Sequence, residues 1–216
     1  MPSRSGLLGL LLSFALGAAP CSLAVAAAAL PISATADLAK PLAIGSTVPA
    51  AMLKTADGAE FSLAAALAAK PTLLVFYRGG WCPFCNTQLA ELQQSQDKFL
   101  ALGYQILAIS TDAPASMPAT VEKNHLGYTL LSDRDMQASS AFGIAWRAEP
   151  ASAERYASRG ISLAPVPGEP GAFWLPVPSV FVVRPPGVIV HTFSDPNFRV
   201  RPPVDALLAA ATAAVK

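Results

Sequence analysis

The chain has 216 residues, of which 53% are hydrophobic and 13% are charged, and its formal net charge is +1. This length and apolar content can fill one core, so we expect a single folded domain. Because no block of lysines or arginines is present, the composition excludes the basic surface typical of a nucleic-acid-binding protein.

The N-terminal 36 residues have the layout of a secretory signal peptide. Arg4 precedes a Leu-rich apolar run that ends at Ala19, and small residues with several Ala-x-Ala options follow. We place the cleavage after Ala36, which leaves residues 37–216 as the mature domain of an exported, periplasmic or otherwise extracytoplasmic protein. The alternative is an uncleaved membrane anchor that tethers the protein through its N-terminus, since no charge interrupts residues 7–30.

The chain has three cysteines, and the leader contains one of them. Cys21 follows Pro20 rather than a small residue, which argues against a lipid-modified cysteine. Removal of the leader leaves Cys82 and Cys85 in an oxidising compartment, three positions apart. The cysteine count therefore indicates redox chemistry.

The first half of the mature chain predicts alternating strands and helices. Glycine, proline and the Asp57-Gly58 turn in residues 37–62 predict an N-terminal hairpin, and Ser62 is a suitable cap for a short helix to Lys70. An unbroken apolar run then predicts a buried strand over residues 72–77. A helix over 83–102, in which Gln96 is the one misfit of the apolar stripe, and a second buried strand over 104–110 follow.

The second half completes an α/β domain with a mixed sheet flanked by helices. Its predicted elements are helices over 116–125, 133–142 and 204–215, a strand over 128–131, and a hairpin of strands 179–183 and 188–193. Between residues 147 and 178, six prolines and three glycines predict a Pro-rich insertion in which no regular element runs far.

Cys82 and Cys85 fall where the first buried strand turns into a helix that begins at Pro83. Backbone N–H groups and the helix dipole favour a thiolate there, and a Cys-x-x-Cys site can lower a cysteine pKa from about 8.5 to roughly 3.5–7.5. Helical residues three apart are neighbours, so the pair can cycle between dithiol and disulfide. A static disulfide or half of a zinc site is the alternative, although only His125 and His191 remain as imidazole ligands.

Residues 76–89, with the sequence FYRGGWCPFCNTQL, resemble the signature of peroxiredoxin-like proteins of the alkyl hydroperoxide reductase/thiol-specific antioxidant group. The resemblance extends from about Ile44 to the C-terminus and includes YQILAIST at 104–111 and LPVPSVFVV at 175–183. It implies a thioredoxin-like fold with a redox-active cysteine pair.

The motif departs from the family pattern at two of three positions. The family's reactive cysteine ends a Pro-x-x-x-Thr-x-x-Cys motif, which places Arg78 at the Pro, Cys82 at the Thr and Cys85 at the peroxide-attacking position. An arginine expected before the 179–183 strand is replaced by Pro178, which resembles the cis-proline that faces the cysteine pair in thioredoxins. By thioredoxin logic Cys82 attacks, and by peroxiredoxin logic Cys85 does, so the order stays open.

Three further residues lie close to the motif in sequence. Arg78 is a candidate for holding a thiolate or a transition-state charge, although an arginine after a strand is often a solvated turn residue. Trp81 is a candidate for shielding the cysteines or contacting a partner protein, and packing is the plainer interpretation. Asp112, at the end of the second buried strand together with Thr111, is interpreted as a helix cap.

The resemblance implies a peroxidase that reduces hydroperoxides with electrons from a thiol donor such as a thioredoxin-like protein, and that uses no cofactor or metal. A sulfenic acid would form first and then a disulfide. The second hypothesis is an exported thiol-disulfide oxidoreductase acting on protein disulfides. The third is a binding module with an inert disulfide.

Overall fold

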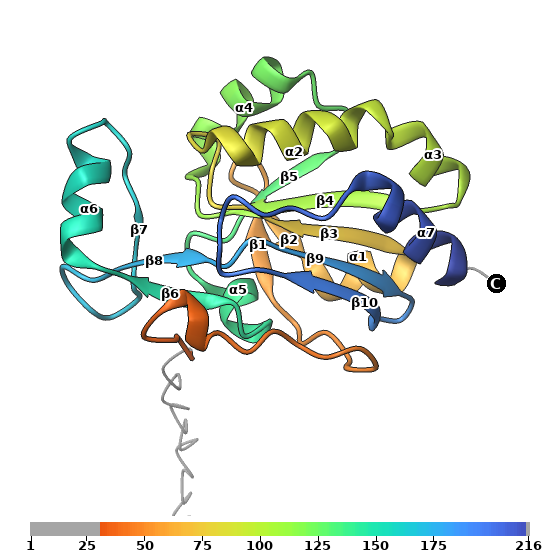
Figure 1. Cartoon of the computed structure of the whole chain (residues 1–216), viewed down its shortest axis with the longest axis horizontal. Coiled ribbons are helices and arrows are strands. Elements are labelled where there is room, and N and C mark those ends of the chain that lie inside the picture. Colours follow the sequence, from red (N-terminus) through yellow and green to blue (C-terminus); the bar gives the residue numbers. More distant parts are fainter. Residues whose placement is uncertain (1–30, 215–216) are drawn as a thin grey trace, which may run out of the picture.

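The computed structural model describes residues 31–214 (Figure 1). Cys21 and most of the predicted leader, including the suggested membrane anchor, lie outside these residues. None of the helices in residues 31–214 has the length and apolar content needed to cross a bilayer.

A central sheet of seven strands confirms the predicted mixed α/β architecture (Figure 1). Its members are β1 (Met52–Lys54), β2 (Glu60–Ser62), β3 (Thr72–Phe76), β4 (Gln105–Ser110), β5 (Thr129–Ser132), β9 (Ser179–Arg184) and β10 (Val188–Ser194). They lie in the order β10-β9-β3-β4-β5-β1-β2. β3, β4 and β5 are parallel, while the predicted hairpins β1-β2 and β9-β10 add antiparallel strands at the two edges.

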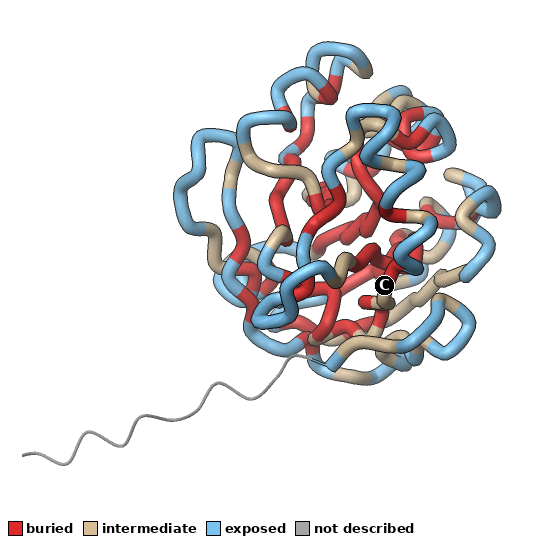
Figure 2. The backbone as a smooth tube through the Cα atoms, turned by 90° about the vertical axis from the view of Figure 1, so that its left-hand side faces the viewer, coloured by how far each residue is buried: buried red, intermediate tan, exposed pale blue. Residues whose placement is uncertain are grey.

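Helices cover both faces of this sheet. One face packs against α2 (Pro83–Gln94), α3 (Gln96–Ala101), α4 (Met117–Asn124) and α7 (Val204–Ala214), and the other against α1 (Leu63–Ala69) and α5 (Gln137–Ala141). The strands β3, β4 and β9 are buried almost throughout, as Figure 2 shows for the centre of the molecule. Their unbroken apolar runs are therefore the sequence mark of a strand covered on both faces.

Capping residues and prolines in the sequence predicted most helix starts correctly, but the structure divides the long helix predicted over 83–102 into two helices. Ser62 caps α1 by accepting a hydrogen bond from the Ala65 N–H, at 3.3 Å. Ser95 leaves the helical conformation, with φ −109° and ψ 5°, and separates α2 from α3. The break turns Gln96 toward the Gly127 carbonyl, to which its amide donates at 3.1 Å, so the misfit residue does not enter the core.

The prediction that no regular element runs far between residues 147 and 178 is wrong. This part of the chain holds α6 (Pro150–Ala157) and, with β6 (Ala145–Ala148), a second sheet in the order β6-β8-β7. β7 (Ala164–Pro165) and β8 (Phe173–Pro176) end at prolines, and α6 begins at one, so these residues bound the elements without interrupting them. The buried Trp174 fills a small core of its own there.

The last residues of the predicted leader pack on this second sheet. The Ser33 N–H donates to the Ala145 carbonyl at 2.9 Å, and the Arg147 N–H donates to the Ser33 carbonyl at 2.8 Å. A short 3-10 turn, η1 (Ala36–Leu38), follows. A chain cut after Ala36 lacks the Ser33 contacts, whereas a chain cut before Ser33 keeps that residue and its contacts.

Candidate active site

The loop between β3 and α2 holds the cysteine motif in a tightly packed turn. The Gly80 N–H donates to Asp112 Oδ2 at 2.8 Å, and Asn86 Nδ2 donates to the Gly80 carbonyl at 2.8 Å. A side chain at Gly80 would overlap the Thr120 hydroxyl of α4, so the close approach of helix and loop requires glycine there. The turn is thus fixed by its neighbours on both sides.

Cys82 is the N-cap residue of α2, and Cys85 lies in the first turn, as the sequence predicts. The Cys82 carbonyl accepts the N–H groups of Cys85 and Asn86 at 3.1 and 3.0 Å. Both thiols are free, and the two residues are only 1% and 0% exposed. The pair is therefore shielded from bulk water.

The two thiols differ in acidity. A hydrogen bond from the Cys85 thiol, with help from the charges of Arg78 and Arg201, lowers the pKa of Cys82 to about 6. Burial, followed by the hydrogen bond to Cys82, raises the pKa of Cys85 well above its ordinary value. At neutral pH the pair is thus a Cys82 thiolate that accepts a hydrogen bond from a neutral Cys85 thiol.

Arg78 is buried rather than solvated, with 5% exposure. Its guanidinium carbon lies 4.3 Å from the ring centre of Phe198, 4.9 Å from that of Trp81 and 5.5 Å from that of Tyr156, and Nη2 donates to the Tyr156 hydroxyl. The ion pairs within residues 31–214 are Lys54–Asp135 and Arg147–Glu169, so no carboxylate of this part neutralises Arg78. Aromatic faces and the neighbouring thiolate remain to stabilise its charge.

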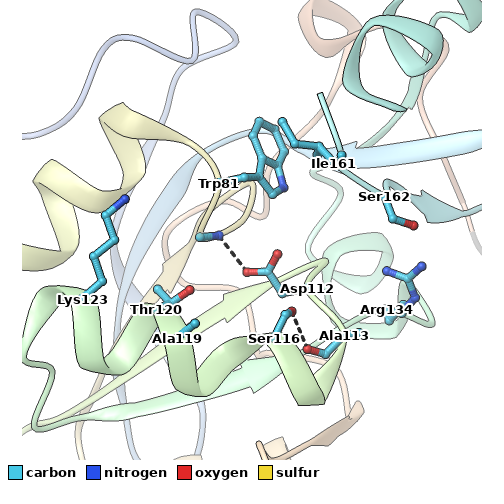
Figure 3. Close-up of a pocket in the computed structure, with 12 residues that line it drawn as sticks. Trp81, Asp112, Ala113, Ser116, Ala119, Thr120, Lys123, Arg134, Ile161 and Ser162 are labelled. Atoms are coloured by element: carbon cyan, nitrogen blue, oxygen red, sulfur yellow. Dashed lines mark hydrogen bonds between the residues drawn. The ribbon is translucent and has the colours of Figure 1, made fainter. Parts of the chain in front are cut away.

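Trp81 lies between this arginine cluster and a cavity of about 410 Å³ (Figure 3). Its ring centre is 5.0 Å from that of Tyr156 of α6. Figure 3 shows the indole beside Ile161, facing Asp112 across the cavity, with Lys123 and Arg134 at its two ends. Neither cysteine lines this cavity, so it borders the loop at Gly80 and Trp81 rather than at the reacting sulfurs.

Sequence reasoning missed Arg201, which lies in the segment between β10 and α7 (Figure 1). Its Nη2 donates to Cys85 Sγ at 3.4 Å. Its Nη1 donates to the carbonyls of Phe198 and Val200, each at 2.7 Å. The local sequence RVRPP has no periodicity, and no signal in it indicates that the segment folds back over the helix tip.

Pro178 does not have the role suggested by the thioredoxin comparison. The cis peptide bond within residues 31–214 precedes Pro186, and the bond before Pro178 is trans. The Pro178 carbonyl accepts from the Asp195 N–H at 3.4 Å, at the start of the segment that carries Arg201. The resemblance to a cis-proline is therefore wrong, because it rested on the position of Pro178 just before a strand, and this position does not determine the isomer.

The remaining candidates have structural surroundings. Asp112 caps no helix, because η2 (Pro114–Ser116) follows Ala113 and α4 begins after Ser116, both without a side-chain cap. It instead binds the Gly80 N–H and the Ser110 hydroxyl, the latter at 3.0 Å, while the Thr111 hydroxyl donates to the Arg78 carbonyl at 3.1 Å. His125 ends α4 in the left-handed region and His191 lies on β10. Across the described part of the chain, no group of three or more His, Cys, Asp or Glu residues could hold a metal ion.

Comparison with known proteins agrees with the motif. The sequence model of the AhpC/TSA family matches residues 44–192, a range that excludes Arg201. The putative peroxiredoxin bcp of Haemophilus influenzae is 36% identical over 104 residues, which are 48% of this chain and 66% of that protein. Peroxiredoxin Bcp of Escherichia coli is 34% identical with the same coverage. The match thus spans slightly less than two thirds of these relatives.

Solved structures share the fold. Peroxidoxin BcpB from Mycobacterium tuberculosis superposes with a TM-score of 0.59 at 21% identity and covers 79% of this chain and 96% of its own. Peroxiredoxin Q from Xanthomonas campestris gives a TM-score of 0.59 at 23% identity, over 77% and 92%. These likenesses confirm the predicted thioredoxin-like fold. Since the family match also covers more than half of its length, the chain belongs to the AhpC/TSA family.

Proposed function

We propose that this protein is a thiol peroxidase that reduces hydroperoxides through the Cys82/Cys85 pair. The observation that carries the proposal is the unequal thiol pair at the tip of α2, in which a Cys85 thiol stabilises a Cys82 thiolate between the charges of Arg78 and Arg201. The relatives that match the chain are named peroxiredoxins, which supports the same chemistry.

In the oxidative half of the cycle, the Cys82 thiolate attacks the terminal oxygen of the hydroperoxide. The O–O bond breaks, and the remaining oxygen takes up a proton and leaves as an alcohol or water, while Cys82 becomes a sulfenic acid. The Cys85 sulfur then attacks Cys82 Sγ, water leaves, and a disulfide forms. The lowered pKa of Cys82 and the raised pKa of Cys85 support Cys82 as the attacking residue and Cys85 as the resolving one.

A dithiol donor closes the cycle by thiol-disulfide exchange, and a thioredoxin-like protein has the required chemistry. Two electrons pass from the donor to the disulfide and from there to the peroxide. All of these steps use sulfur, so the cycle requires neither a metal nor an organic cofactor.

One observation favours a second candidate, a thiol-disulfide oxidoreductase acting on protein disulfides. A Cys-x-x-Cys pair whose first thiol is acidic and whose second is buried is also suited to attack a substrate disulfide and then release it. The two candidates differ in substrate and share the Cys82–Cys85 disulfide.

Rapid-mixing experiments on the reduced protein test the peroxidase. We expect the Cys82→Ser variant to lose peroxide reactivity by about three orders of magnitude, and the Cys85→Ser variant to keep it and to accumulate a Cys82 sulfenic acid visible by mass spectrometry. The double variant gives the background rate. Sulfenic acid at Cys85 in the Cys82→Ser variant would reverse the assigned order.

Assays of hydroperoxide consumption and of insulin disulfide reduction distinguish the peroxidase, the oxidoreductase and the inert binding module. The peroxidase consumes hydroperoxide in the presence of a thiol donor and reduces insulin disulfides slowly. Fast insulin reduction without peroxide turnover would favour the oxidoreductase, and neither activity, together with a disulfide that resists reduction, would favour the binding module.

We also propose that the chain is exported to the periplasm or another extracytoplasmic compartment. The charge, apolar run and small residues of the N-terminal 36 residues support this. Fusion of these residues to a reporter that is active only after export tests the targeting, and N-terminal sequencing of the product gives the cleavage site. A product that keeps Met1 and stays with the membrane fraction would indicate the tether, and an inactive reporter would exclude export.

A further inference from the structure

Arg201 touches the less acidic of the two sulfurs. Its Nη2 lies 3.4 Å from Cys85 Sγ, and Cys85 is fully buried. Its Nε is also buried and has no hydrogen-bond partner within residues 31–214. The guanidinium therefore approaches a sulfur that is neutral in the reduced protein, and no carboxylate of the described residues pairs with it.

A cation beside Cys85 is needed in the reductive half of the cycle, in which the donor reduces the Cys82–Cys85 disulfide. When a donor thiolate attacks the disulfide at Cys82, the sulfur of Cys85 must leave with the bonding electron pair. A sulfur with a high thiol pKa leaves slowly, and burial raises the pKa of Cys85. Without a compensating group, the environment that makes Cys85 a good proton donor to Cys82 would also slow reduction of the disulfide.

We propose that Arg201 is a catalytic residue of the reductive half-reaction, where its guanidinium donates a hydrogen bond to Cys85 Sγ as this sulfur leaves the disulfide. The proposal rests on the proposed function only for the Cys82–Cys85 disulfide, which the peroxidase and the oxidoreductase have in common. It assigns a role to a residue outside the range that the family model matches.

The step balances as an ordinary exchange. A donor thiolate forms a bond to Cys82 Sγ, the Cys82–Cys85 bond breaks, and its electron pair passes to Cys85 Sγ as a thiolate held by Arg201. The second donor thiol gives its proton to Cys85 and, as a thiolate, attacks the mixed disulfide, which releases the Cys82 thiolate. The donor leaves oxidised, and the protein is left with a thiolate at Cys82 and a thiol at Cys85.

The segment holds Arg201 in place for this task. Two carbonyls, of Phe198 and Val200, orient Nη1, and the Pro202-Pro203 pair that follows restricts the backbone. Arg78, the other arginine near the cysteine pair, is buried and is committed to the Tyr156 hydroxyl and to three aromatic faces. Of these two arginines, Arg201, which is partly buried, is thus the one hydrogen-bonded to the resolving sulfur.

The test measures the two half-reactions separately in full-length protein. The disulfide is made with diamide, so the starting material does not depend on peroxide reactivity, and its reduction by dithiothreitol and by a thioredoxin is followed by rapid mixing. We expect Arg201→Met to slow reduction by about tenfold or more, the scale of a hydrogen bond to a charged group. Oxidation by peroxide should change by less than this factor.

Two further variants separate catalysis from folding. Arg199→Met changes a neighbouring arginine whose guanidinium lies over the rings of Phe84 and Phe198, and in residues 31–214 the guanidinium hydrogen bond to a sulfur comes from Arg201. The disulfide of the Arg199→Met variant should be reduced at a rate within twofold of the wild-type rate. Arg201→Lys keeps a cation and should recover part of the rate. In the Cys82→Ser background, Arg201→Met should also raise the pKa of Cys85, measured by thiolate absorbance, which a purely structural role would not do.

The outcomes are distinct. Equal reduction rates for Arg201→Met and the wild type would overturn the proposal, as would a loss confined to peroxide oxidation. Equal losses in Arg201→Met, Arg201→Lys and Arg199→Met, with lowered melting temperatures and an unchanged Cys85 pKa, would make the segment structural only. If the wild type does not turn over peroxide but Arg201→Met still slows reduction of the disulfide, the proposed peroxidase is refuted and the role of Arg201 is supported.

Discussion

The helix tip and the segments that cover it form one site, but they are built differently. The tip, residues 79–85, is a continuous stretch that carries both sulfurs and is held by short contacts to Asp112 and Asn86. The cover consists of single side chains from distant segments, namely Tyr156 from α6 and Phe198 and Arg201 from the segment after β10. The reacting atoms are thus local in sequence, whereas the groups that set their charge and access are not.

This difference shows why the two cysteines, although three residues apart, have opposite acidities. The helix N-terminus favours a thiolate near both of them. At Cys82 the hydrogen bond from Cys85 lowers the pKa by more than burial raises it, whereas at Cys85 burial and the same hydrogen bond both raise the pKa. The local motif therefore supplies the pair and its mutual hydrogen bond, and burial and the charges of Arg78 and Arg201 act on the acidity of both thiols.

The largest expected effect is a difference between the two cysteines in their rate of alkylation. With a pKa of about 6, Cys82 is mostly thiolate at pH 7, whereas a thiol with a raised pKa is mostly neutral. Since the thiolate is the nucleophile, iodoacetamide should label Cys82 about 100-fold faster than Cys85 in the reduced protein at pH 7. The labelling rate of Cys82 should rise as the pH increases through about 6 and level off above it.

Peptide mapping by mass spectrometry assigns the label to each cysteine. Protein unfolded in urea is the control, and there both cysteines should react equally with the pH dependence of an ordinary thiol. Equal labelling of the two cysteines in folded protein would refute the proposed asymmetry between the attacking and resolving thiols.

A smaller effect is expected from the backbone of the tip. Gly80→Ala introduces a methyl group into the Thr120 hydroxyl of α4, and we expect it to lower the free energy of unfolding by about 2 kcal/mol, as overpacking does. The double variant Gly80→Ala with Thr120→Ala removes the overlapping atoms and should recover most of this loss. Urea denaturation of both variants measures the difference. An unaltered stability of the single variant would show that the loop can shift to accommodate the methyl group.

The smallest expected effect concerns the cover. Tyr156→Phe keeps the ring beside Arg78 and Trp81 but removes the hydroxyl that accepts from Arg78 Nη2. We expect a loss of about 1 kcal/mol in the free energy of unfolding, because a buried donor loses its partner. A double-mutant cycle with Arg78→Met isolates this contact, and additive effects of the two substitutions would mean that the side chains are not coupled.

Much of the fold could be predicted from sequence because its signals are local. The unbroken apolar runs of β3 and β4, the cap at Ser62 and the turn at Asp57-Gly58 each depend on neighbouring residues only. The second sheet was missed because the prolines of residues 147–178 were taken as interruptions, whereas they lie at the ends of α6, β7 and β8. β7 has two residues, which is too short for any periodicity to be seen.

The sequence by itself determined that two sulfurs lie together at a helix tip, because a Cys-Pro-Phe-Cys motif at a strand-to-helix turn requires no distant partner to bring them together. Only the tertiary structure decided the surroundings of those sulfurs. It buried Arg78 among three aromatic rings, placed Arg201 on Cys85 and left Pro178 without the cis bond. The physical reason is that proximity along the chain is encoded locally, whereas contacts across more than 100 residues form only when the whole sheet and its helices are assembled.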